Sequence, residues 1–115
     1  MFKYNAELVR IIDGDTVIAM VDLGFSTWKK VTVRLYGINT PETRTRDLEE
    51  KAKGLAAKER LTQILVDENE GKFILESFGV GKFGRCLGDI WIKNTNVDKQ
   101  LVIEGHANDY LAGKR

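Results

Sequence analysis

Four charged side chains in this sequence have the types and surroundings that phosphodiester cleavage requires. Asp15 lies in an Asp-Gly-Asp-Thr turn, Arg34 and Glu42 belong to the segment Val-Arg-Leu-Tyr-Gly-Ile-Asn-Thr-Pro-Glu at 33–42, and Arg85 follows a glycine. The reaction needs positive charge where the phosphorane becomes negative, a positioned base and often a hard cation. Arginine can bind two phosphate oxygens at once, and carboxylate oxygens suit Ca²⁺ or Mg²⁺ better than zinc.

Each of these residues also has a plainer interpretation when it is taken alone. Asp-Gly-Asp is common in hairpin turns, and an arginine such as Arg34 on an alternating strand is usually a solvated residue. The glycines around Arg85 are explained by a hairpin that needs positive φ. Glu42 follows Pro41 in a stiff loop, which favours a positioned base, although a lone surface glutamate is commoner.

The segments that carry these residues have the pattern of β-strands. Residues 8–12 and 16–23 are β-branched runs on either side of the turn at 13–15, so they predict a hairpin. Residues 31–36 alternate apolar and polar side chains, which predicts a third strand with Arg34 on the face opposite Val33 and Leu35. Residues 72–78 and 85–92 predict a second hairpin around three glycines.

Two helices are expected between and after these strands. From Asp47 to about Val66, apolar residues fall near helical spacing, at Leu48, Ala52, Leu55, Ala56, Ile64 and Leu65. Gly54 inside this helix costs about 1 kcal/mol relative to alanine, so we expect close packing against the sheet there. Asn96 resembles the N-cap of a short second helix that Gly105 closes. Five strands with a helix between the third and fourth predict a mainly β fold, an OB-type Greek-key barrel.

Composition limits the class of protein. The 115 residues suit one domain, 43% are hydrophobic and 30% charged, and the net charge of +1 predicts that any phosphate-binding surface is local. The single cysteine and single histidine exclude an internal disulfide, a Cys/His metal site and a Ser-His-Asp triad. No apolar run has the length of a signal peptide or membrane span, so we expect a monomeric cytoplasmic protein without membrane contact, or a secreted one if a leader was removed.

The order and spacing of the motifs resemble the staphylococcal nuclease (thermonuclease) family. The matching segments are Ile-Asp-Gly-Asp-Thr at 12–16, the segment 33–42, Gly-x-x-Ala at 54–57, Phe-Gly-Arg-Cys-Leu at 83–87 and Leu-Val-Ile-Glu-Gly-His-Ala at 101–107. These segments span nearly the whole chain, and their joint occurrence is specific for a fold that, in this family, is an OB-type barrel with helices.

The resemblance implies a calcium-dependent nuclease that hydrolyses DNA and RNA and leaves 3′-phosphates. It also implies the roles of the site residues. Ca²⁺ is bound by Asp15, Asn39 and the carbonyl of Thr40, with Asp13 close by. Glu42 is the general base, the phosphate is held by Arg34 and Arg85, and the nucleotide pocket is lined by Lys82, Phe83 and Tyr110. Aromatic stacking on a base tolerates any sequence, which fits a nonspecific enzyme.

One departure from the family pattern bears on the metal. Asn39 stands where the family usually has an aspartate ligand, and calcium affinity follows the charge of the ligands, so we expect weaker metal binding. Gly81 and Phe83 also replace an acidic residue and a tyrosine that many relatives carry. Two functions therefore stay open: an active metal-dependent nuclease, and a catalytically weak or inactive OB-fold module of nuclease descent that binds nucleic acid or protein.

Overall fold

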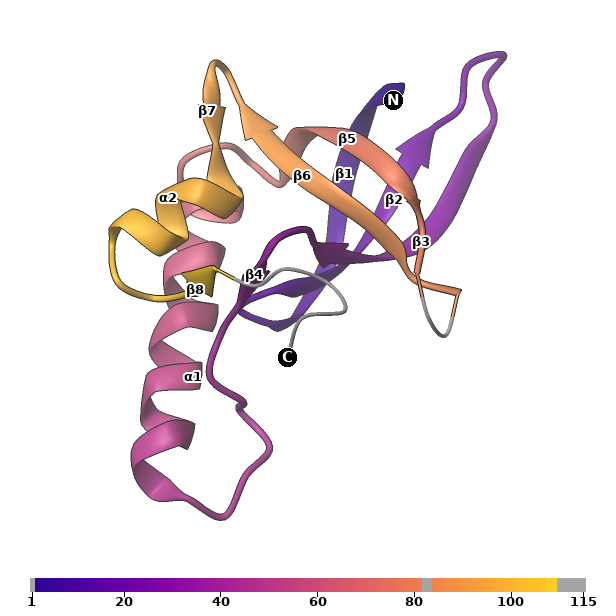
Figure 1. Ribbon diagram of the computed structural model, residues 1–115. Coiled ribbons are helices and arrows are strands. Elements are labelled where there is room, and N and C mark those ends of the chain that lie inside the picture. The colour runs from indigo at the N-terminus through magenta and orange to yellow at the C-terminus, as the bar shows by residue number, and fades with distance from the viewer. Residues whose placement is uncertain (1, 82–83, 110–115) are drawn as a thin grey trace.

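Five strands form a closed barrel in the computed structural model, which describes residues 2–81 and 84–109. The strands are β1 (Phe2–Asp13), β2 (Thr16–Asp22), β3 (Trp28–Leu35), β5 (Lys72–Val80) and β6 (Cys86–Ile92). Their order in the sheet is β3-β2-β1-β5-β6, and a parallel pairing of β3 with β6 closes it (Figure 1). The predicted mainly β, OB-type barrel is therefore confirmed.

The two predicted hairpins and their buried faces are present. Asp13 pairs with Thr16 across the first turn, and β2 buries Val17, Ala19 and Val21 as its alternation predicts. These side chains belong to one hydrophobic core that each barrel strand helps to line. Because the core takes every second residue of a strand, the residues between them point away from it.

The first strand is longer than predicted. It begins at Phe2 and not at Leu8, and its first half pairs with β5 from Phe2↔Ser77 to Glu7↔Lys72. Polar residues between Lys3 and Glu7 hid this half of the strand, because only its inward side chains are apolar. A strand with one solvated face alternates in this way.

Two helices and three short strands complete the described fold. The helix α1 (Leu48–Thr62) continues into a π-helical turn, η1 (Gln63–Asp67), and α2 (Val97–Ile103) follows the barrel. The two-residue strands, which sequence patterns did not predict, are β4 (Ile38–Asn39), β7 (Thr95–Asn96) and β8 (Asn108–Asp109). Asp47 and Asn96 cap the two α-helices with their side chains. Among the described residues, no helix is long and apolar enough to cross a bilayer.

The predicted apolar face of the first helical segment is correct at its end, where Ile64 and Leu65 are buried, and wrong over α1 itself. Leu48 is 79% exposed and Leu55 48% exposed, whereas the helix buries Gly54, Ala57 and Leu61. Figure 1 shows the reason, since the first half of α1 extends past the barrel and has the preceding loop beside it. Only the second half of α1 and η1 reach the core.

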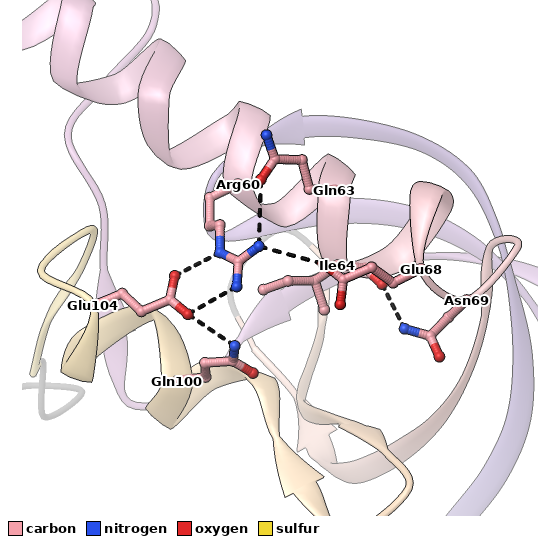
Figure 2. A network of polar contacts seen from close by, with 7 residues as sticks. All are labelled: Arg60, Gln63, Ile64, Glu68, Asn69, Gln100 and Glu104. Carbon is pink, nitrogen blue, oxygen red and sulfur yellow. Dashed lines mark hydrogen bonds and ion pairs between the residues drawn. The ribbon is translucent and has the colours of Figure 1, made fainter.

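A polar network holds the end of α1 and η1 against α2 (Figure 2). Arg60 donates to Glu104 through both Nε, at 2.6 Å, and Nη2, at 3.0 Å, and it lies 3.4 Å from Glu68. Gln100 donates to the same Glu104 carboxylate at 2.8 Å. Hydrogen bonds from Arg60 and Gln100 lower the pKa of Glu104 to about 2, so this carboxylate stays ionised and paired over the whole neutral range.

The second helix carries one buried acid. Asp98 is 1% exposed, and its Oδ1 accepts a hydrogen bond of 3.0 Å from the backbone N–H of Ile90 in β6. Its Oδ2 is buried without a hydrogen-bond partner among the described residues. Burial, followed by the neighbouring Asp89, raises the pKa of Asp98 well above its ordinary value. This acid joins α2 to β6 at the cost of an unsatisfied oxygen.

Candidate active site

The candidate catalytic residues surround one hollow at an end of the barrel. The hollow measures about 170 Å³ and is lined by Asp13, Asp15, Thr16, Arg34, Asn39, Thr40, Pro41, Glu42 and Arg85. These residues come from the β1–β2 turn, from β3, from β4 and the loop after it, and from the start of β6. Segments far apart in the sequence therefore supply three carboxylates and two guanidinium groups to the same small volume.

Asp15 is the most firmly held carboxylate of the site. It is 8% exposed; its Oδ1 accepts from the hydroxyl of Thr16 at 3.0 Å, and its Oδ2 accepts from the backbone N–H of Thr40 at 3.0 Å. Its own carbonyl accepts from the N–H of Leu35 at 2.8 Å. These bonds join the β1–β2 turn to the end of β3 and to the loop after β4, so Asp15 organises the site as well as lining it.

Arg34 lies between the oxygens of three neighbours. Its Nη1 donates to the carbonyl of Leu35 at 2.8 Å, its Nη2 donates to Oδ1 of Asn39 at 3.3 Å, and Nη2 lies 3.5 Å from Oδ2 of Asp15. The side chain is only 15% exposed. An arginine fixed in this way keeps one orientation, which reduces the entropy lost when it binds an anion.

Arg85 reaches the same hollow because β6 runs parallel to β3. Cys86 pairs with Val33 and Leu87 with Arg34, so the residue just before β6 lies beside β3, two positions before Arg34 in the register. Gly84, at φ +72°, provides the left-handed backbone that turns the chain into this strand, as the hairpin interpretation predicts. The two arginines therefore approach the hollow from neighbouring strands.

Glu42 lies at the exposed rim of the hollow, on the loop that connects β4 to α1. The next residue, Thr43, donates its hydroxyl to Oδ1 of Asp13 and so ties this loop to the β1–β2 turn. Glu42 also lines a second hollow together with Glu50 and Asn108, so its carboxylate is open to water. An accessible carboxylate beside two arginines is suitably placed to accept a proton from water.

Gly54 sets the position of this loop. A Cβ at residue 54 would lie 2.6 Å from the carbonyl oxygen of Glu42 and 2.7 Å from that of Pro41. The prediction that Gly54 packs against the sheet is therefore wrong, because the helix extends past the barrel there and meets the loop. Gly14 has a matching role, since a Cβ there would lie 2.8 Å from Cβ of Ala57. Helix α1 thus contacts both the turn and the loop that carry the carboxylates.

The oxygens that converge here have the chemistry of a hard-cation site. Asp15 offers a carboxylate, Asn39 an amide oxygen, and Thr40 a hydroxyl that is buried without a hydrogen-bond partner among the described residues. Such ligands fit Ca²⁺ or Mg²⁺. Within residues 2–81 and 84–109, however, no group of three or more His, Cys, Asp or Glu side chains is arranged to hold a metal. The types of donor atom therefore fit a hard cation, and the formal negative charge of this set of ligands is low.

All three predicted nucleotide-pocket residues, Lys82, Phe83 and Tyr110, lie outside the described residues. Sequence reasoning in turn missed two hydroxyl groups that support the carboxylates, those of Thr16 and Thr43. Each lies next to a predicted site residue, which is the only signal that the sequence offers. The contribution of Gly54 and Ala57 to the site was hidden in the Gly-x-x-Ala segment, whose spacing gives no indication of what the helix contacts.

Comparison with known proteins places this chain in a family. The family model described as staphylococcal nuclease homologue matches residues 32–115, and the chain belongs to this family. Its members share a nuclease-like domain, and the resemblance read from the motifs is thereby confirmed.

Two relatives match nearly all of the chain. One is the protein ParB of Escherichia coli, 33% identical over 94% of this chain and 58% of its own length. The other is the uncharacterized protein MJ1439 of Methanocaldococcus jannaschii, 32% identical over 95% of this chain and 60% of its own length. The chain thus spans about three fifths of the length of either relative.

Proposed function

We propose that this protein is a calcium-dependent, sequence-nonspecific nuclease that hydrolyses phosphodiester bonds of DNA and RNA and leaves 3′-phosphates. The observation that carries the proposal is the convergence of Arg34 and Arg85, from neighbouring strands, on a hollow that also contains Asp15 and Glu42. Family membership supports a nuclease-like hydrolase, and the finer points of metal, substrate and product are our inference from the resemblance to that family.

In this proposal the two arginines bind the scissile phosphate. Arg34 and Arg85 donate to its non-bridging oxygens and stabilise the negative charge that builds up as phosphorus becomes pentacoordinate. Glu42 accepts a proton from the water whose oxygen attacks phosphorus. The bond from phosphorus to the 5′ oxygen breaks, and that oxygen leaves with a proton as a 5′-hydroxyl, so the phosphate remains on the 3′ side.

The cation would be held by Asp15, Asn39 and the backbone carbonyl of Thr40, with Asp13 close by. Bound there, Ca²⁺ supplies positive charge that polarises the phosphate and orients it. The protein contributes the rest, because Asp15 fixes the β1–β2 turn to the loop after β4 through its bond to Thr40. Asn39 lowers the charge of the ligand set by one, so we expect calcium affinity to be weak.

The proposal is tested by the cleavage of labelled single-stranded DNA with Ca²⁺ and with excess chelator. We expect chelator-sensitive cleavage, and end-group analysis should find 3′-phosphates. Glu42→Gln and Arg85→Lys should each lower kcat at least about 100-fold, the second because lysine keeps the charge and loses the two-pronged donor. Glu49→Gln is the matched control, since this exposed carboxylate lines neither hollow around Glu42.

A second function, an OB-fold module that binds nucleic acid or protein without cleavage, is favoured by one observation. Asn39 replaces a negative charge in the ligand set, and its amide oxygen already accepts from Arg34. The test uses protein concentrations far above those of a working nuclease. If the protein then binds an oligonucleotide but shows no chelator-sensitive cleavage, this second function is supported and the first is rejected.

A further inference from the structure

A second hollow, directly beside the candidate active site, is lined by cations. It measures about 330 Å³, and its lining residues are Arg10, Ile11, Ile12, Thr43, Arg44 and Lys58. Three positively charged side chains from β1, from the loop before α1 and from α1 itself meet there. No carboxylate is part of this lining. In a chain whose net charge is only +1, such a segregation of charge is a local feature of the surface.

The three cations have no partner of opposite charge in the part of the chain that the structure describes. Arg10, Arg44 and Lys58 form no ion pair there, whereas Arg60 pairs with Glu68 and Glu104. Like charges gathered around one hollow repel one another, and an anion between them removes that repulsion. The hollow is therefore complementary to a negatively charged group.

The position of this hollow relates it to the catalytic one. Ile12 lines the cationic hollow and Asp13 lines the catalytic one; likewise Thr43 lines the first and Glu42 the second. The hydrogen bond from Thr43 to Asp13 runs between the two hollows. A chain that carries anionic groups at regular intervals can therefore place one group in each.

The chemistry of the lining points to the backbone of such a chain and not to its bases. No aromatic side chain lines the hollow, so it offers no surface for base stacking, whereas arginine and lysine are common phosphate donors. Contacts of this kind do not depend on sequence. They position a strand without reading it.

We propose that the hollow formed by Arg10, Arg44 and Lys58 is a phosphate subsite, which holds a backbone phosphate of a nucleic-acid strand next to the phosphate in the catalytic hollow. The inference rests on the proposed function and extends it, because it makes a polynucleotide strand the preferred substrate over a single nucleotide. Free inorganic phosphate shares the same chemistry, and the experiment below separates the two.

The test measures binding without cleavage, in excess chelator, by fluorescence anisotropy of a labelled oligothymidylate over a series of salt concentrations. The variant combines Arg10→Gln, Arg44→Gln and Lys58→Gln. We expect its affinity to fall at least about 10-fold at low salt, and the slope of log K against log salt to become shallower by roughly two, since each contact with a single strand contributes about 0.7. Arg44→Gln alone, on an exposed loop, should give about a third of the change in slope.

The control combines Lys29→Gln, Lys30→Gln and Lys99→Gln, which removes the same charge from exposed positions outside both hollows. Equal losses in the two triple variants, or an unchanged slope in the first, would overturn the subsite. A third outcome would identify a site for free phosphate and also overturn the subsite. In that case millimolar inorganic phosphate displaces the oligonucleotide from the wild type, and wild type and variant bind the oligonucleotide equally well without phosphate.

The result for the phosphate subsite can be distinguished from the result for the proposed nuclease activity. If the wild type never cleaves DNA but the first triple variant alone loses affinity, the subsite is supported and the proposed catalysis is rejected. If the wild type cleaves while both triple variants bind equally, the catalysis stands and the subsite is rejected.

Discussion

Replacing Gly54 by alanine tests whether helix α1 positions the catalytic loop. The added Cβ would lie 2.6 Å from the carbonyl oxygen of Glu42, so loop or helix must move by at least 0.4 Å to reach a tolerable 3.0 Å and by 0.8 Å to restore an ordinary contact of 3.4 Å. Both Glu42 and Pro41 present backbone atoms at this point, so no side-chain rotation can relieve the contact. The displacement falls on the residue that we assign as the base.

The expected effects on stability and on activity differ in size. Alanine favours the helix by about 1 kcal/mol over glycine, and overpacking costs about 1–3 kcal/mol, so the net free energy of unfolding should fall by no more than about 2 kcal/mol. A misplacement of the base by about 1 Å can lower the rate about 100-fold. Gly54→Ala should therefore remain folded and lose most of its calcium-dependent cleavage of single-stranded DNA.

Ala56→Gly provides the matched control on the same helix. This residue is exposed, so the change should destabilise the protein by about 1 kcal/mol and leave the loop in place. We expect thermal unfolding to show losses of similar size in the two variants, and kinetic assays to show that only the control stays active. If Gly54→Ala keeps the wild-type kcat/KM and its crystal structure shows Glu42 in the same position, then α1 does not position the catalytic loop in the way that we propose.

Three further predictions concern charge. Asn39→Asp should tighten Ca²⁺ binding about 10-fold or more by calorimetry, and unchanged affinity would count against Asn39 as a ligand. Glu104→Gln should lower the free energy of unfolding, measured by chemical denaturation, by about 1–2 kcal/mol at pH 7 and by almost nothing at pH 2. The reason is that the pKa of this carboxylate falls from 4.5 to about 2 on folding, so it stabilises the protein above pH 4.5 and loses this contribution as the pH drops. Glu59→Gln, on the exposed face of α1, should leave the free energy of unfolding unchanged at both pH values. Asp98→Asn should be more stable relative to wild type at pH 7 than at pH 3, because folding raises the pKa of Asp98 well above 3.8 and the stability of the wild type therefore decreases as the pH rises above 3.8. Parallel profiles of stability against pH for wild type and variant would show that Asp98 is not the titrating group.

The local pattern of the sequence was sufficient for the barrel strands other than the first half of β1, and for the N-caps of the two helices. Alternation along β2 and β3 predicted which side chains are buried, because a strand turns every second residue to the same face. Asn96 was identifiable as an N-cap because its side chain satisfies a backbone N–H three residues away, at 3.2 Å from Lys99. Interactions of such short range depend on neighbours in the chain, so the chain alone reveals them.

The three-dimensional arrangement of the site depended on contacts between distant segments. The parallel pairing of β3 and β6 brings Arg85 beside the strand that carries Arg34, and no local pattern contains this register. Likewise, the helical spacing predicted an apolar face whose first half, with Leu48 and Leu55, is exposed although Ile64 and Leu65 are buried, and it gave Gly54 the wrong neighbour. Which side of a helix is buried depends on where the helix extends past the barrel, and only packing decides that.

By itself, then, the sequence determined the chemistry available to this protein: the carboxylates, the two arginines and the family to which their spacing belongs. The tertiary structure decided that these groups share one hollow, that Arg34 lies among the oxygens of Asp15 and Asn39, and that a second, cationic hollow adjoins the first. The physical reason is that the sequence specifies the types of side chain, whereas the distances between them across a barrel result from strand register and the close packing of the core.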